Sequence, residues 1–150
     1  PRPGVERLVR EARANGVRVA IATTASPDGV NAFFAGNEAL RDAFEVIVAG
    51  DDVPRKKPAP DAFLLALERL ACAAHDALAI EDSAIGLQAA RAAGIATLVT
   101  PSGYTLGEDF TGASAVLDSR GDPEEPARAA SGPAPPRGVV DLAYARSLVA

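Results

Sequence analysis

Side chains suited to phosphoryl chemistry follow three apolar segments of this sequence, at the point where each segment ends. Thr23 follows the first segment, Lys57 lies in the loop after the second, and Glu81 and Asp82 follow the third. Fixed donors and cations stabilise the spread negative charge of a transferring phosphoryl group, and carboxylates hold the hard cation Mg²⁺. We therefore expect Thr23 and nearby backbone N–H groups to bind phosphate, Lys57 to neutralise it, and Asp82 with Glu81 to hold the metal.

Each of these residues also has an ordinary structural interpretation. A threonine at a strand end is commonly a turn or N-cap residue, and a lysine before proline is commonly a solvated loop charge. An acidic pair ahead of a helix could simply favour the helix macrodipole. The combination of all three, in this order and each at a strand end, favours a shared site over three separate coincidences.

Alternating helices and strands are expected to position these side chains. The hydrophobic periodicity and the stop signals predict helices at 3–16, 27–44, 58–72, 83–94 and 139–150, with a break in the second expected near Gly36. They predict strands at 17–23, 44–50, 77–80, 96–100 and 114–118. Such alternation predicts an α/β, doubly wound (Rossmann-like) parallel sheet covered on both faces, with ligands at the carboxyl ends of its strands.

The 150 residues are expected to form one domain, with 48% hydrophobic residues available for its core. We divide the chain into an α/β core at 1–118, a Pro/Gly-rich exposed loop at 119–138 and a terminal helix at 139–150. The loop has no hydrophobic period, so no regular structure is predicted there.

The net charge of −5 disfavours a dedicated nucleic-acid or anionic-membrane surface. No apolar run approaches the length of a membrane span, and the first residues lack the apolar core of a signal peptide. Cys72 is the single cysteine, so an intrachain disulfide is impossible. These features together favour a cytoplasmic location, with neither nucleic acid nor membrane as a partner.

Three segments resemble motifs of a known enzyme family, the haloacid dehalogenase-like (HAD) hydrolases, which are Mg²⁺-dependent phosphatases and phosphomutases. "VRVAIATT", "KKPAPDAF" and "IEDSAIGLQAARAAGI" are similar to the second, third and fourth motifs of that family. Beyond these motifs, most of the chain resembles the CbbY-type sugar-phosphate phosphatases within the family.

The resemblance implies a role for each candidate residue. Thr23 and the amide of Thr24 would bind the transferring phosphoryl group, and Lys57 would pair with that group and with the nucleophile. Asp82 would be a direct metal ligand, and Glu81 would ligate directly or through water.

The first motif of the family is missing from this sequence. That motif is Asp-x-Asp at the end of a central strand, and it supplies the nucleophile and the general acid and base, whereas no Asp-x-Asp occurs here. The resemblance implies the C-terminal part of an enzyme, without its central first strand and without its helical cap domain. Because flanking strands would then keep unpaired backbone groups, we expect residues 1–150 alone to be unstable or self-associating.

Three functions stay open at this point. The first is a Mg²⁺-dependent phosphohydrolase of small phosphorylated sugars, acting through an aspartyl-phosphate whose aspartate lies outside this chain. The second is a phosphomutase on the same scaffold, and the third is a catalytically inactive module that binds phosphate or a partner. The sequence leaves open which sugar phosphate is bound and the oligomeric state.

Several further polar and aromatic residues are expected to have lesser roles. His75 is expected at the surface, Asp51 or Asp52 could shape the site from outside its ligand shell, and Tyr104 and Phe110 are expected to pack locally.

Overall fold

The computed structural model describes residue 2 and residues 4–149. Its α-helices are α1 (Val5–Ala14), α2 (Pro27–Phe34), α3 (Glu38–Asp42), α4 (Asp61–Leu70), α5 (Ala84–Ala92) and α6 (Leu142–Ser147). Its strands are β1 (Ala20–Ala22), β2 (Val46–Val48), β3 (Leu78–Glu81), β4 (Ala96–Val99), β5 (Ala115–Leu117) and β6 (Ala129–Ser131). Two short 3₁₀ helices, η1 (Gly50–Asp52) and η2 (Ala74–Asp76), follow β2 and α4. The mixed α/β class predicted from the sequence is confirmed.

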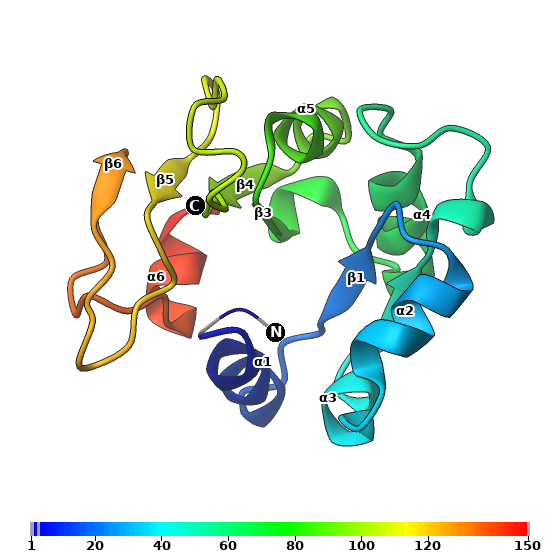
Figure 1. The fold of residues 1–150 in the computed structure, drawn as a ribbon, viewed down its shortest axis with the longest axis horizontal. Helices are drawn as coiled ribbons and strands as arrows, with labels where there is room; N and C mark the ends of the chain where they lie inside the picture. The colour runs from blue at the N-terminus through cyan, green and yellow to red at the C-terminus, as the bar shows by residue number, and fades with distance from the viewer. Residues whose placement is uncertain (1, 3, 150) are drawn as a thin grey trace.

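The strands form two separate sheets. β1 pairs with β2 in parallel, with Ile21 opposite Ile47. β3, β4 and β5 are parallel neighbours in a second sheet, and β6 is antiparallel to β5. β1 and β3 are therefore both edge strands, and Figure 1 shows them on opposite sides of the centre of the molecule.

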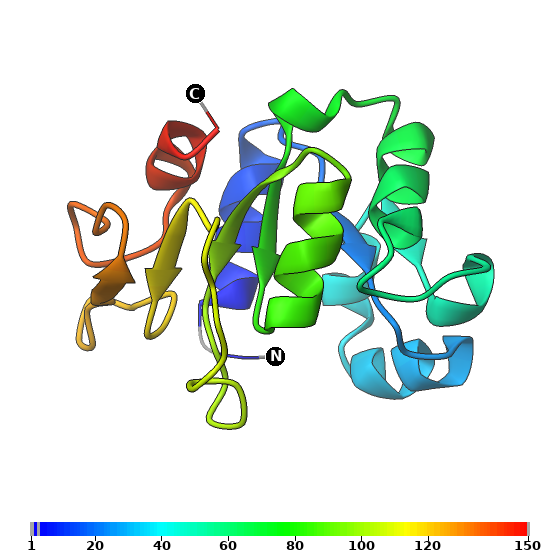
Figure 2. The same cartoon turned by 90° about the horizontal axis from the view of Figure 1, so that it is seen from above.

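Helices cover both faces of these strands, as a doubly wound fold requires. Alternate residues along β3 demonstrate this, because Ile80 packs against the cluster that contains α6, whereas Ala79 packs against α5 and α4. In β1, Ile21 likewise packs on the side of α2, and its neighbours Ala20 and Ala22 pack on the side of α4. Figure 2 shows α1 behind β3 and β4 and α5 in front of them.

Two helices connect the two sheets across the gap between β1 and β3. Leu8 of α1 packs against the cluster of the four-stranded sheet, whereas Val9 belongs to the cluster beside β1 and β2. On the opposite face, Ala66 of α4 packs with β2 and Leu67 packs with the cluster around Ala79. The gap is therefore closed on both faces by helices, although its two edge strands do not pair with each other.

A cavity of about 660 Å³ occupies this gap, which we call the slot. β1 and β3 form its sides, and apolar residues of α1 and α4 form its two covers; among the lining residues are Leu8, Val9, Ile21, Leu67, Leu78 and Ile80. An apolar space between two unpaired strand edges is the feature expected where a central strand is missing from a parallel sheet.

Most predicted elements are confirmed, and one prediction needs correction. The helix predicted at 27–44 is broken as expected at Gly36, whose φ is +76°, and a new helix starts at its N-cap Asn37. The segment 119–138 was predicted to lack regular structure, yet it contains β6, whose three residues are exposed and pair with β5. Periodicity gave no signal for β6 because an exposed edge strand needs no apolar face.

Within residue 2 and residues 4–149, no helix has both the length and the apolar character needed to cross a membrane.

Candidate active site

Thr23 and Thr24 follow β1 directly, at its carboxyl end. The amide of Thr23 donates to the carbonyl of Val48 at 2.9 Å, so the pairing of β1 with β2 extends to this residue. The hydroxyl of Thr23 accepts a hydrogen bond from the amide of Ala25 at 3.1 Å, which forms a tight turn. Gly50 supports the turn from the β2 side, because any side chain there would collide with the carbonyl of Thr24.

Lys57 reaches across from the loop after β2 to the four-stranded sheet. Its ammonium group forms an ion pair with the carboxylate of Glu81, and both side chains are only 10% exposed. The ammonium nitrogen also lies 4.7 Å from the centroid of the Phe63 ring, within cation–π range. This ion pair connects the two sheets at the carboxyl ends of their strands.

The carboxylate of Glu81 lies over the first turn of α5. Gly86 of that turn makes the position possible, since a side chain at Gly86 would occupy the place of the Glu81 carboxylate. Burial raises the pKa of Glu81 above its ordinary value, although the neighbouring Lys57 acts in the opposite direction. Sequence analysis assigned Glu81 to the metal, and the structure places its carboxylate on Lys57.

Asp82 is exposed at the rim, immediately after β3. The residue that follows it, Ser83, is the N-cap of α5 as predicted, and its hydroxyl accepts from the amide of Gly86 at 3.1 Å. The junction between β3 and α5 is therefore a short, hydrogen-bonded turn that holds Asp82 at the carboxyl end of its strand.

The five predicted site residues line one cavity of about 680 Å³ at the carboxyl ends of β1 and β3; they are Thr23, Thr24, Lys57, Glu81 and Asp82. The cavity adjoins the slot, because Ile21, Ile80 and Glu81 line both. The arrangement places a hydroxyl, an ammonium and two carboxylates around one space, beside the open edges of two strands.

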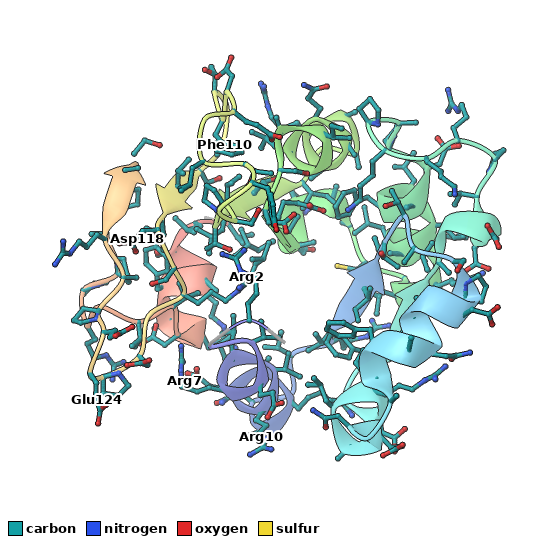
Figure 3. All side chains as sticks on the ribbon, viewed as in Figure 1. Arg2, Arg7, Arg10, Phe110, Asp118 and Glu124 are labelled. Atoms are coloured by element: carbon teal, nitrogen blue, oxygen red, sulfur yellow. The ribbon has the colours of Figure 1, made fainter. Side chains whose placement is uncertain are left out.

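Two arginines that sequence analysis did not single out also line this cavity. The Arg2 guanidinium donates to the carbonyls of Thr100 and Pro101 at 2.6 and 2.8 Å, and Figure 3 shows it extending from the N-terminal segment toward the centre of the molecule. Burial, reinforced by the nearby charge of Arg2, lowers the pKa of Arg120 to about 10. Arg120 follows β5 closely, so the rule that found the other site residues at strand ends could have found it.

The carboxylates match a Mg²⁺ site in kind but not in number. Mg²⁺ prefers oxygen ligands in an octahedral arrangement. Among residue 2 and residues 4–149, no group of three or more Asp, Glu, His or Cys residues is close enough to hold a metal. Asp82 and Glu81 could therefore supply part of a Mg²⁺ shell, and further oxygens would have to come from substrate, water or another segment.

Other candidates lie away from the cavity or have structural tasks. The Asp52 carboxylate accepts from the amide of Ala49 at 2.8 Å and closes the turn after β2. His75 is exposed in η2, as predicted. Phe110 packs locally against Leu87, as expected, but the expectation for Tyr104 was wrong, because that side chain is completely exposed.

The comparisons with known proteins agree with this geometry. The family model described as haloacid dehalogenase-like hydrolase matches residues 1–94, which include all five predicted site residues. The chain belongs to the haloacid dehalogenase-like hydrolases.

Particular HAD proteins are similar to this chain over most of its length. Protein CbbY of Rhodobacter capsulatus is 50% identical over 113 residues, which are 74% of this chain and 50% of that protein. The crystal structure of CbbY from Rhodobacter sphaeroides in complex with phosphate is 45% identical, with a TM-score of 0.75, over 79% of this chain and 53% of that one. A putative β-phosphoglucomutase from Thermotoga maritima is 29% identical, with a TM-score of 0.68, over 76% of this chain and 54% of its own.

The chain spans about half the length of the curated relatives that it matches. The other half of those two relatives lies outside the matched region.

Proposed function

We propose that residues 1–150 form part of a Mg²⁺-dependent phosphohydrolase that acts on small phosphorylated sugars. The observation that carries this proposal is the single cavity at the carboxyl ends of β1 and β3, around which Thr23, Lys57 and Asp82 gather. A structure of CbbY from Rhodobacter sphaeroides contains xylulose-1,5-bisphosphate, which supports a phosphorylated sugar as the class of substrate.

In this proposal each residue acts on a different part of the phosphoryl group. The Thr23 hydroxyl and the Thr24 amide bind its oxygens, and Lys57 neutralises the charge that builds up on them. Asp82, assisted by Glu81, holds the Mg²⁺ ion, which would supply further charge neutralisation when bound. The Lys57–Glu81 ion pair keeps the ammonium group oriented toward the cavity before a substrate enters.

The nucleophile would come from a segment outside residues 1–150, in agreement with the slot between β1 and β3. A strand in the slot would pair with both open edges, and its carboxyl end would reach the cavity that Thr23 and Asp82 line. An aspartate at that end would attack phosphorus and displace the sugar oxygen, and water would then hydrolyse the resulting aspartyl-phosphate to inorganic phosphate.

Two alternatives use the same residues in other ways. A phosphomutase would return the phosphoryl group to a second sugar hydroxyl instead of releasing it to water, and the Thermotoga maritima relative supports this variant. A catalytically inactive module would bind phosphate or a partner without turnover. The location is proposed to be cytoplasmic, on the basis of the single cysteine.

The decisive experiment uses the complete polypeptide encoded by the reading frame that contains residues 1–150, which we call the reading-frame product. Release of inorganic phosphate from sugar monophosphates and bisphosphates is measured with Mg²⁺ and with a chelator. We expect Mg²⁺-dependent release, and we expect Asp82→Asn and Lys57→Ala each to lower it by at least about 100-fold.

Matched controls separate a catalytic loss from a general one. Asp76→Asn alters an exposed acid near the opposite end of the same strand, and Arg55→Ala alters an exposed cation in the same loop as Lys57. Both controls should keep their activity. Full activity in Asp82→Asn and Lys57→Ala would refute the site, and a shift of phosphate between two sugar positions without release would favour the mutase.

A further inference from the structure

The loop at 102–108, which we call the clamp loop, is attached to the turn between β3 and α5 by two polar side chains. The hydroxyl of Thr105 donates to the backbone carbonyl of Asp82 at 2.6 Å. The carboxylate of Glu108 accepts from the amide of Ala84, the first residue of α5, at 2.6 Å. Two hydrogen bonds from one loop thus reach the residues on either side of Ser83.

Thr105 is itself held firmly within the clamp loop. Its hydroxyl accepts from the amide of Ser102 at 2.9 Å, and its own amide donates to the Ser102 carbonyl at 3.0 Å. The amide of Glu108 in turn donates to the carbonyl of Thr105 at 3.0 Å. The loop is therefore an ordered turn, and a fixed turn can determine where its two anchoring side chains point.

Apolar packing does not explain the contact of this loop with the domain. Tyr104 is completely exposed and Leu106 is 67% exposed, so the side chains on either side of Thr105 face solvent. Only the polar residues of the loop turn toward the β3–α5 junction. The loop is therefore attached to this junction by the hydrogen bonds of Thr105 and Glu108.

The turn that receives these hydrogen bonds is also fixed from the other side. The amide of Thr100, after β4, donates to the carbonyl of Glu81 at 2.8 Å, and Ser83 caps α5. The backbone on both sides of the Asp82 side chain is consequently restrained by neighbouring strands, by the helix start and by the clamp loop. This restraint limits the directions in which the Asp82 carboxylate can point.

We propose that Thr105 and Glu108 are positioning residues for the acidic pair, and that they set its affinity for a divalent cation by fixing the backbone at Asp82–Ala84. This inference rests on the proposed function, because it assigns the cation to Asp82. Groups that orient a metal ligand without touching the metal typically change metal affinity by about 10- to 100-fold when they are removed.

The test measures cation binding to the reading-frame product in the absence of substrate, by calorimetric titration with Mg²⁺ and by the EPR signal of free Mn²⁺. Thr105→Val removes the hydroxyl but keeps the shape of the side chain, and it should raise the Kd by about 10-fold. Thr105→Ser restores the hydroxyl and should restore the affinity. Thr111→Val is the matched control, because Thr111 lies just after the clamp loop and its hydroxyl bonds to Asp109, at 2.6 Å.

Glu108 provides a second, independent variant, since its side chain is exposed and its substitution should leave the fold intact. Glu108→Ala should speed hydrogen exchange at the amide of Ala84 and weaken Mg²⁺ binding, whereas Glu108→Gln keeps an acceptor oxygen and should lose less. In kinetics, both Thr105→Val and Glu108→Ala should raise the Mg²⁺ concentration needed for half-maximal rate while leaving the KM for substrate nearly unchanged.

The possible results separate this inference from the proposed function. If the unsubstituted protein binds no divalent cation, the metal assignment itself fails, and the positioning role fails with it. If the unsubstituted protein binds the cation and Thr105→Val and Glu108→Ala bind it equally well, only the positioning role is refuted.

Discussion

The two sheets contribute different halves of the candidate site. The two-stranded sheet carries Thr23 at the end of β1 and, through the loop after β2, Lys57; the four-stranded sheet carries Glu81 and Asp82. The groups proposed to bind phosphate thus lie on one side of the slot, and those proposed to bind the metal lie on the other. The Lys57–Glu81 ion pair crosses between them.

Burial also differs between the strands beside the slot and those beyond it. In β4 and β5, Leu98 and Leu117 are entirely buried, and so is Val48 of β2, the strand beyond β1. All three residues of β1 are only partly buried. β1 therefore has the composition of a buried strand but not the burial. We infer that the two sheets are the flanks of one sheet that a further strand would complete.

The largest expected effect concerns the slot as a whole. Residues 1–150 as an isolated polypeptide should be much less stable than the reading-frame product, because unpaired buried backbone groups cost about 1–3 kcal/mol each against a total of about 5–15 kcal/mol. Far-UV circular dichroism during urea unfolding and size-exclusion chromatography measure this. A monomeric, cooperative transition of the isolated polypeptide at the same midpoint would contradict the comparison.

The next prediction compares a core residue of the four-stranded sheet, Leu98, with a residue of the two-stranded sheet, Ile21. Leu98→Ala removes a completely buried side chain and should lower the free energy of unfolding by about 2–5 kcal/mol. Ile21→Ala should have a clearly smaller effect in the isolated polypeptide, because Ile21 lines the slot. In the reading-frame product the two losses should become similar. Urea unfolding measures both losses. If Ile21→Ala lowers the free energy of unfolding by the same amount in the isolated polypeptide and in the reading-frame product, the slot is not filled in the reading-frame product.

The third expected effect is a gain in stability, at Arg120, which lines both the slot and the cavity beside it. Arg120 has a pKa lowered to about 10, so its charged form is disfavoured in the folded state, and the free energy of unfolding should rise as pH increases from about 10 to 12.5. Arg120→Leu should therefore stabilise the isolated polypeptide by about 1–3 kcal/mol at pH 7.

Urea unfolding at pH 7 measures this gain. Arg10→Leu is its control, because the Arg10 side chain is 80% exposed and its substitution should change the midpoint little. A loss of stability in Arg120→Leu would show that the guanidinium has a stabilising partner in the folded chain.

The smallest effect is expected where the two-stranded sheet begins. Arg18 and Glu45 precede β1 and β2, and their side chains form an exposed ion pair of 3.0 Å. Hydrogen bonds from Arg18 lower the pKa of Glu45 below 4.5. The stabilisation is therefore present above pH 4.5 and is lost as the pH falls through the lower folded value. Glu45→Gln should give a barely measurable decrease in Tm at pH 7 that vanishes in acid; a large decrease would contradict this.

Local patterns in the sequence determined most of the elements and the choice of the candidate site residues. The capping serine Ser83, the break at Gly36 and the apolar runs that end at Thr23 and Glu81 are signals contained in neighbouring residues. The rule that ligands collect at the carboxyl ends of parallel strands then placed those residues on one rim, and they do line one cavity.

Contacts between distant residues were decided by the tertiary structure alone. The carboxylate of Glu81 is held by Lys57 and accommodated by Gly86, Arg120 lines the same cavity, and Thr105 binds the backbone of Asp82. Strand periodicity specifies which face a side chain takes, but it does not specify which strands become neighbours. Which strands pair within each of the two sheets therefore cannot be read from periodicity. Strand pairing depends on every strand that is present, whereas a helix cap or an apolar run depends only on the residues around it.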